Sequence, residues 1–312
     1  MVIGGLQKFS LLDYPGHISA IVFTQGCNFR CHFCYNPMLV CPVSRVGGKL
    51  KYSRAEKDEK RKDHFSLYKE DDLFDFLASR TGKLEGVVIT GGEPTIHPDL
   101  LKFITKIKKL GYKVKLDTNG TNPAMLKKLL APLTRRSKGG NKADKKNNPP
   151  IPFLSGGRLV DYIAMDIKAP LEKYGEVAGL PLSKLSWRAV ERSEAISVKS
   201  HSPEIASSSR GGTPRNDSFV NLEKIKKSIK IIMGANIPYE FRTTVVPGLI
   251  KPEDINKMGE MINGAEIWYL QQFKSNIKLV DESFMGQKSY NIKEMKKMAK
   301  IAGQYVKKCE IR

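Results

Sequence analysis

Short apolar runs alternate with amphipathic segments along most of this 312-residue chain, and this alternation limits the fold more than any other feature. Strands that alternate with helices are typical of parallel βαβ units, in which each helix returns the chain beside the previous strand. Such runs cover residues 18–24, 86–90, 113–117, 161–166, 239–245 and 266–272. These six are fewer than the eight strands of a closed barrel. The sequence therefore predicts an α/β fold, a partial, open (β/α)6 barrel, with a doubly wound sheet as the alternative.

The segments between these runs carry apolar residues at helical spacing. In 98–110 they recur every three or four residues, Pro98 suits a first helical turn, and Gly111 suits a C-terminal stop. Residues 222–233 repeat the pattern, and Gly234 follows them. Weaker patterns of the same kind predict helices over 69–80, 123–131 and 252–262.

Three stretches interrupt this rhythm. Residues 44–66 are charged and faintly patterned, whereas residues 134–157 and 181–219 are rich in Gly, Ser, Pro and Lys. Such compositions bury little apolar surface, so they do not favour packed elements. We therefore expect flexible insertions at these places within a single domain that covers residues 1–312.

The formal net charge of +21 raises the possibility of nucleic-acid binding. The lysines, however, lie on predicted solvated helix faces or in polar stretches without interleaved aromatic residues; Lys106, Lys108 and Lys109 are examples of the first kind. This distribution favours a soluble surface and an acidic protein partner. A basic, metal-stabilised nucleic-acid-binding protein remains a remote alternative.

Apolar stretches of the kind that cross or enter membranes are not seen in the sequence. No run approaches the length that spans a bilayer, and the N-terminal residues lack the basic start and apolar core of a secretion signal. We therefore predict a cytoplasmic protein without a membrane partner.

Three of the five cysteines lie close together, directly after the first predicted strand. Cys27, Cys31 and Cys34 have the spacing Cx3Cx2C, and Phe33 precedes the last of them. Thiolates are the ligands of iron–sulfur clusters, and three ligands on a four-iron cube leave one iron open for a substrate. The alternative is a structural zinc site, which is closed by four ligands. His32 is too near its neighbours to be an obvious fourth ligand, so the sequence favours a cluster.

Polar residues recur at the ends of the later predicted strands. In the TGGEP turn, glycines let the backbone approach a ligand closely, and the glutamate can accept a hydrogen bond from an ammonium group. A basic residue at the fifth strand suits a carboxylate or ribose contact. Ordinary turn chemistry and surface ion pairs are the alternatives for the DTNG and D-x-K elements. Because parallel strands end on one face, where barrel enzymes build their sites, we expect these residues to form one site.

The cysteine motif resembles the signature of the radical S-adenosylmethionine (SAM) superfamily, which has an aromatic residue before the third cysteine. The resemblance implies a [4Fe–4S] cluster whose open iron chelates SAM, and reductive cleavage to methionine and a 5′-deoxyadenosyl radical. GGEP resembles the motif that holds the SAM amino group, and DTNG and D-x-K resemble elements of the SAM pocket in glycyl-radical-enzyme activases. By this resemblance Asp166 and Lys168 contact SAM, and Asp117 and Thr118 help bind a cation beside it. The implied SAM-binding residues are Phe33, Gly91, Gly92, Glu93, Asp117, Thr118, Asn119, Asp166, Lys168 and Arg242.

Longer stretches resemble the activating proteins of anaerobic ribonucleoside-triphosphate reductase, over residues 1–43, 69–131, 158–180 and 220–275. This resemblance implies a radical SAM oxidoreductase that generates a glycyl radical on that reductase, with a flavodoxin- or ferredoxin-type electron donor. The alternatives are another glycyl-radical enzyme of the pyruvate formate-lyase type, or a small molecule, as substrate. Activases with additional ferredoxin-like clusters are disfavoured, because the two cysteines left over are too few.

Overall fold

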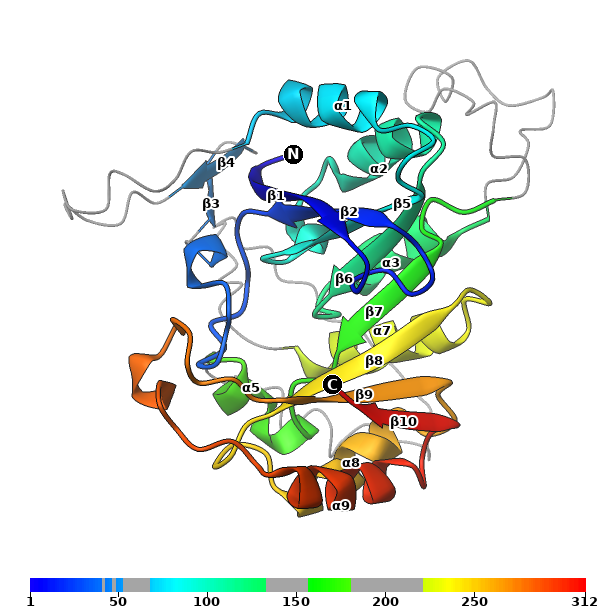
Figure 1. Ribbon diagram of the computed structural model, residues 1–312. Coiled ribbons are helices and arrows are strands. Elements are labelled where there is room, and N and C mark those ends of the chain that lie inside the picture. The colour runs from blue at the N-terminus through cyan, green and yellow to red at the C-terminus, as the bar shows by residue number, and fades with distance from the viewer. Residues whose placement is uncertain (41–42, 47–48, 53–67, 133–156, 181–220) are drawn as a thin grey trace, which may run out of the picture.

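An eight-stranded sheet forms the centre of the protein (Figure 1). The computed structural model describes residues 1–40, 43–46, 49–52, 68–132, 157–180 and 221–312. The strands are β1 (Ile3–Ser10), β2 (Ser19–Thr24), β5 (Gly86–Gly91), β6 (Lys113–Thr118), β7 (Tyr162–Asp166), β8 (Tyr239–Val245), β9 (Ile267–Gln272) and β10 (Lys308–Ile311). They lie side by side in chain order; β1 is antiparallel to β2, and all the other neighbours are parallel.

This strand order is that of an open barrel. The six predicted strands are β2 and β5 to β9, and each pairs with its neighbour in the sequence, as in a (β/α) barrel. A doubly wound sheet would instead reverse its order part-way across. Strands β1 and β10 form the two edges of the sheet, so the barrel is not closed. The prediction of a partial, open barrel is therefore confirmed.

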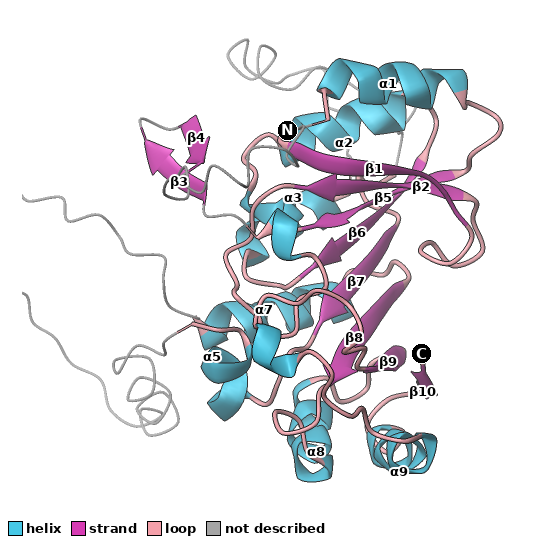
Figure 2. Ribbon diagram, turned by 60° about the vertical axis from the view of Figure 1, so that its left-hand side comes forward, coloured by secondary structure: helices cyan, strands magenta, loops and turns pink. Residues whose placement is uncertain are grey.

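The helices lie around the curved sheet, with α1 and α2 near its first strands and α8 and α9 near its last (Figure 2). Their apolar faces are buried in one continuous core, as the burial of Phe103 and Ile107 in α2 illustrates. Asn122 and Asn221 cap α3 and α7 by accepting hydrogen bonds from backbone amides. The helices are α1 (Glu70–Ser79), α2 (Leu100–Lys109), α3 (Pro123–Leu130), α5 (Tyr174–Val177), α7 (Leu222–Met233), α8 (Pro252–Met261) and α9 (Ile292–Ala302).

A small antiparallel hairpin stands apart from the main sheet, within the first predicted insertion. Its strands are β3 (Val43–Val46) and β4 (Lys49–Tyr52). The rest of that insertion, residues 134–156 and residues 181–219 lie outside the described residues, so the flexible insertions and the single domain stay predictions. None of the helices in the described ranges combines the length and apolar character that a membrane span requires.

Candidate active site

The cysteine loop, residues 25–40, follows β2 and is held at its start by backbone hydrogen bonds. Gly26 donates to the carbonyl oxygen of Leu39 at 2.8 Å, and the amide of Glu93 donates to the carbonyl oxygen of Gly26 at 2.8 Å. Cys31 is buried, whereas Cys27 and Cys34 are half-buried. None of the described cysteines is joined in a disulfide. The three thiols are therefore presented on a fixed loop at the carboxyl end of β2.

Burial raises the pKa of all three thiols above the ordinary cysteine value. For Cys31 burial raises the pKa to about 11, although the charge of Lys168 works in the opposite direction. Cys27 is also close enough to the other two thiols for their charges to raise its pKa further. Thiolates are the metal-binding form, so this loop suits a ligand that supplies positive charge on binding.

The donor set fits an iron–sulfur cluster. Within the described residues, no three His, Cys, Asp or Glu side chains converge as the ligands of one metal ion do. A cubane presents its irons at separate corners, so its cysteines need not meet at one point. Three free thiols on one loop match that ligand chemistry and not a closed zinc site, since the imidazole of the intervening His32 contacts Asp281 instead.

The two glycines after β5 allow the chain to pass very close to the start of the cysteine loop. Gly91 has φ +113°, and a Cβ atom on it would lie 2.4 Å from the amide nitrogen of Thr24. A Cβ atom on Gly92 would lie 1.9 Å from the carbonyl oxygen of Gly26. The two glycines therefore let the turn pack directly against the backbone of the cysteine loop. This packing is present without a ligand.

We expect Gly92→Ala to displace the cysteine loop, because backbone must move to relieve the contact with Gly26. Overpacking of this kind costs about 1–3 kcal/mol. Urea unfolding of the protein without metal should show this loss, and reconstituted variant should bind less iron than wild type. The control is Gly5→Ala in β1, where a Cβ atom would approach nothing closer than 3.8 Å. Equal iron binding by Gly92→Ala and wild type would contradict the expectation.

Glu93 joins the turn after β5 to the loop after β6. Its carboxylate is buried and accepts hydrogen bonds from Thr95, from the hydroxyl of Thr118 at 2.7 Å and from the amide of Asn119 at 2.6 Å. Burial raises the pKa of Glu93, although these donors work against it. The donors other than the Asn119 amide all contact Oε1, so Oε2 accepts the fewer hydrogen bonds of the two oxygens.

Asn119 also links the cysteine loop to the loop after β6. Its side-chain amide donates to Asn28 at 2.9 Å, and Asn28 donates to Thr121 at 2.9 Å. Thr121 closes the ring by donating to the Asn119 oxygen at 2.7 Å. Asn28 and Thr121 are absent from the sequence prediction, because asparagine and threonine in loops carry no pattern that predicts a partner so distant in sequence.

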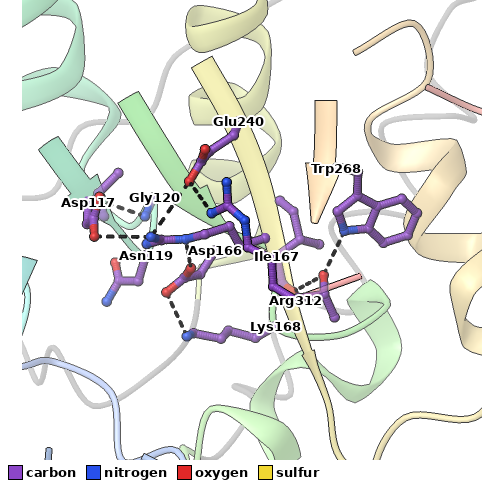
Figure 3. Close-up of polar contacts among 12 residues, drawn as sticks. Asp117, Asn119, Gly120, Asp166, Ile167, Lys168, Glu240, Trp268 and Arg312 are labelled. Atoms are coloured by element: carbon purple, nitrogen blue, oxygen red, sulfur yellow. Dashed lines mark hydrogen bonds and ion pairs between the residues drawn. The ribbon is translucent and has the colours of Figure 1, made fainter. Parts of the chain in front are cut away.

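Predicted residues from three neighbouring strands meet in a charged cluster, at the carboxyl ends of β6 and β7 and the middle of β8. Arg242 donates to Asp117 at 3.1 Å and to Asp166 at 3.1 Å, and Lys168 donates to Asp166 at 2.9 Å. Figure 3 shows Asp117, Asp166 and Lys168 together at these strand ends. Asp117 also pairs with Lys115 at 3.2 Å. The charge of Asp117 is therefore balanced by two cationic side chains of the protein, Lys115 and Arg242. This geometry does not support the predicted cation beside SAM.

Burial alone would raise the pKa of Asp166, but Lys168 and Arg242 hold it at about 2. The unfolded carboxyl titrates near 3.8, so ionised Asp166 stabilises the fold above that pH and the contribution is lost as pH falls toward 2. Between pH 6 and pH 3, the free energy of unfolding should fall in both proteins. We expect the fall to be smaller in Asp166→Asn than in wild type by roughly 1 kcal/mol. Urea unfolding at both pH values measures the difference. Equal losses in the two proteins would show that the pKa of Asp166 is not depressed.

The charged cluster reaches the cysteine loop through Lys168. Its Nζ lies 5.9 Å from the centre of the Phe33 ring, and its charge acts on both Cys31 and Cys34. Tyr174, which the sequence analysis does not identify, joins the same two parts: its ring packs edge-on against Phe29 at 6.2 Å between centroids, and its hydroxyl accepts a hydrogen bond from the amide of Lys168 at 3.4 Å. The structure therefore brings the three cysteines, Phe33, Asp166 and Lys168 together at one end of the sheet.

Residues 21–135 match the family model of the radical SAM superfamily. The chain carries a radical SAM domain. The matched segment contains the cysteine loop, the glycine turn and the loop after β6. Radical SAM enzymes use a [4Fe–4S] cluster and SAM, and the cofactor prediction and the prediction of a radical SAM oxidoreductase are confirmed at that level.

Similar proteins include one that matches this chain along its full length. It comes from Methanocaldococcus jannaschii and is named, by inference, a glycyl-radical enzyme activating enzyme. The two are 26% identical over 312 residues, which cover 100% of this chain and 95% of that protein. A Saccharolobus solfataricus protein, named by inference a GTP 3′,8-cyclase, is 32% identical over 101 residues, covering 32% of this chain and 26% of that protein.

Solved structures with a similar fold are more distant. Streptococcus suis SuiB bound to S-adenosylmethionine has a TM-score of 0.47 and 11% identity, covering 92% of this chain and 47% of SuiB. Escherichia coli QueE has a TM-score of 0.41 and 14% identity, covering 86% of this chain and 83% of QueE. This chain thus spans about half the length of SuiB. Both TM-scores are below 0.5, so the fold assignment rests on the strand order described above.

Proposed function

We propose that this radical SAM enzyme is an activase that generates a glycyl radical on a partner enzyme, and that the partner is anaerobic ribonucleoside-triphosphate reductase. The observation that carries the proposal is the full-length match to the M. jannaschii protein named as a glycyl-radical enzyme activating enzyme. The choice of reductase rests on the resemblance of the cysteine loop, the glycine turn and the strand ends to the reductase activases.

In this proposal Cys27, Cys31 and Cys34 hold the [4Fe–4S] cluster at the end of β2. When bound, the cluster supplies the electron that cleaves SAM to methionine and a 5′-deoxyadenosyl radical. Lys168, a half-buried cation beside Phe33, suits a carboxylate group, and the ionised carboxylate of Asp166 suits ammonium or hydroxyl groups.

Arg242 fixes these groups before any ligand arrives. Its guanidinium donates hydrogen bonds to both Asp117 and Asp166. Burial lowers the pKa of Arg242, but the charges of these carboxylates raise it by more and keep the guanidinium protonated. A site whose polar groups are already oriented loses less conformational entropy when it binds SAM. We therefore assign Arg242 the role of orienting the SAM-contacting residues, with Glu93 and Asn119 holding the neighbouring loops.

The proposed reaction takes place in the cytoplasm, and the electron comes from a flavodoxin- or ferredoxin-type donor. The glycine hydrogen abstracted from the partner passes to the 5′-deoxyadenosyl radical, which gives 5′-deoxyadenosine. One 5′-deoxyadenosine and one protein glycyl radical are thus formed for each SAM cleaved, if abstraction follows every cleavage.

The test is to mix anaerobically reconstituted, reduced enzyme and SAM with anaerobic ribonucleotide reductase, and to record the electron paramagnetic resonance spectrum. We expect a glycyl radical signal on the reductase, accompanied by 5′-deoxyadenosine. A parallel sample contains a pyruvate formate-lyase type enzyme, and a third contains no protein partner. A signal only on the second enzyme would overturn the assignment of the reductase. Rapid 5′-deoxyadenosine formation that requires a small molecule and no protein would overturn the activase assignment.

A further inference from the structure

The chain after β9 returns to the cysteine loop, although their strands are far apart in the sheet. Strand β2 is second in the strand order and β9 is seventh. In Figure 1 the orange segment between β9 and α9 lies beside the blue loop that follows β2. Phe273 and Leu279 of this segment are buried, and their side chains anchor the segment to the hydrophobic core. Residues 273–287, here called the return segment, thus cover part of the cysteine loop.

His32 is the main point of contact, and it lies directly after Cys31. Its backbone carbonyl oxygen accepts a hydrogen bond from the amide of Asp281 at 3.0 Å. Its Nδ1 lies 3.0 Å from Oδ2 of the same aspartate, and its ring stacks on Phe284 with 5.8 Å between centroids and an interplanar angle of 23°. Three separate contacts therefore hold one residue of the cysteine loop.

Asp281 is itself held in the orientation that this contact needs. Its other carboxylate oxygen, Oδ1, accepts hydrogen bonds from the amide of Ser283 at 3.0 Å and from its hydroxyl at 2.6 Å. The carboxylate therefore uses one oxygen to fix its own turn and the other to hold His32. This division of contacts is what a preorganised positioning group requires.

A second contact lies beside the third cysteine. The hydroxyl of Tyr35, which follows Cys34, accepts a hydrogen bond from the amide of Lys274 at 2.9 Å. The two fixed residues, His32 and Tyr35, are thus the immediate neighbours of two of the three thiols. A loop whose ligands are already held by contacts outside the loop loses less conformational entropy when it binds a cluster.

We propose that His32, Asp281 and Phe284 form a clasp that positions Cys31, next to the Tyr35–Lys274 contact beside Cys34, so that cluster binding and clasp closure stabilise each other. The inference rests on the proposed function, because the ligand it concerns is the cluster of the activase. Coupling between binding free energies is reciprocal, so a clasp that strengthens cluster binding must itself be stabilised in its closed form by the cluster. These three are positioning residues; none of them needs to contact SAM.

The test compares the rate at which anaerobically reconstituted full-length proteins release iron to a ferrous chelator. His32→Phe keeps a ring for the stack on Phe284 and removes the hydrogen bond, and Asp281→Ala removes the other partner. Each variant is expected to release iron roughly 10-fold faster than wild type, as the loss of one charge-assisted hydrogen bond predicts. The double variant should be little faster than either single variant, because both remove the same contact. Glu282→Ala, which removes an exposed carboxylate from the adjacent residue, should release iron at the wild-type rate.

Amide hydrogen exchange gives a readout that does not depend on iron chemistry. The amides of Lys274 and Asp281 are expected to exchange more slowly in wild type with the cluster than without it, and this difference should disappear in Asp281→Ala. Release of iron at the wild-type rate by both single variants, from a wild type that holds a cluster, would overturn the clasp and leave the proposed function intact. A wild type that takes up no cluster would instead overturn the proposed function, and the clasp with it.

Discussion

A Cys31→Ala variant is expected to form no measurable 5′-deoxyadenosine from SAM after anaerobic reconstitution and reduction. Cys31 is the most deeply buried of the three thiols, and Lys168 lies close enough to act on its pKa. Removal of a residue that hydrogen-bonds to a metal ligand typically lowers metal affinity or activity about 10–100-fold. Loss of a ligand itself should therefore lower product formation by more than roughly 100-fold. Product analysis by chromatography, together with the iron content of each protein, measures the effect.

The matched control is Cys309→Ala. Cys309 lies in β10 at the edge of the sheet and is half-buried, and burial raises the pKa of its thiol to about 11, as it does for Cys31. The two substitutions therefore remove thiols of similar acidity, but only one lies in the cysteine loop. Undiminished 5′-deoxyadenosine formation by Cys31→Ala would exclude this residue as a ligand. Zinc in the purified wild type, together with no uptake of a cluster, would favour the alternative of a metal-stabilised nucleic-acid-binding protein.

An Arg242→Met variant is expected to lose about 3–5 kcal/mol of unfolding free energy, because removal of one partner leaves buried charges uncompensated. The side chain of Arg242 is 14% exposed and contacts Asp117 and Asp166 directly, while Glu240, which is fully buried, lies 3.8 Å away. Lys115, Lys168 and the partly exposed Arg312, which lies 3.6 Å from Glu240, would then have to balance three carboxylates. Urea unfolding near neutral pH, without metal, measures the loss.

Arg80→Met provides the comparison for this change. Arg80 is exposed at the end of α1, where its guanidinium lies over the Phe76 ring, and surface substitutions of this kind usually stay within about 0.5 kcal/mol. SAM binding to Arg242→Met should also weaken, because Asp117 and Asp166 lose the group that orients them. A free energy of unfolding close to that of wild type would show that the carboxylates find other partners or bind protons.

The sequence predicts the repeating part of this fold well. Strands β2 and β5 to β9 are apolar runs with helices between them, and α7 covers the predicted residues 222–233. Strands β1 and β10 were not predicted, for a physical reason. Both lie at edges of the sheet, where pairing on one side and partial exposure remove the continuous apolar run that identifies a central strand.

For the candidate site, the residues that the sequence identifies are those whose position at a strand end is set by the βαβ repeat. Asp117, Asp166 and Arg242 meet because β6, β7 and β8 are neighbours in the sheet. The partners that complete the site are not predictable in the same way. His32 and Asp281 are joined across 249 residues by loops without a repeating pattern, and no periodicity relates them. Their roles in cluster binding stay predictions until the variants described above are made.

The separation of the return segment from the cysteine loop in the chain has a consequence for protein synthesis. Lys274 and Asp281 are made 239 and 249 residues after Tyr35 and His32, the residues that they hold. At translation rates of about 5–20 residues per second, this interval lasts roughly 10–50 s. Throughout that time the segment that covers the cysteine loop does not yet exist. The growing chain therefore exposes its three thiols to whatever delivers iron and sulfur well before the finished protein can cover them.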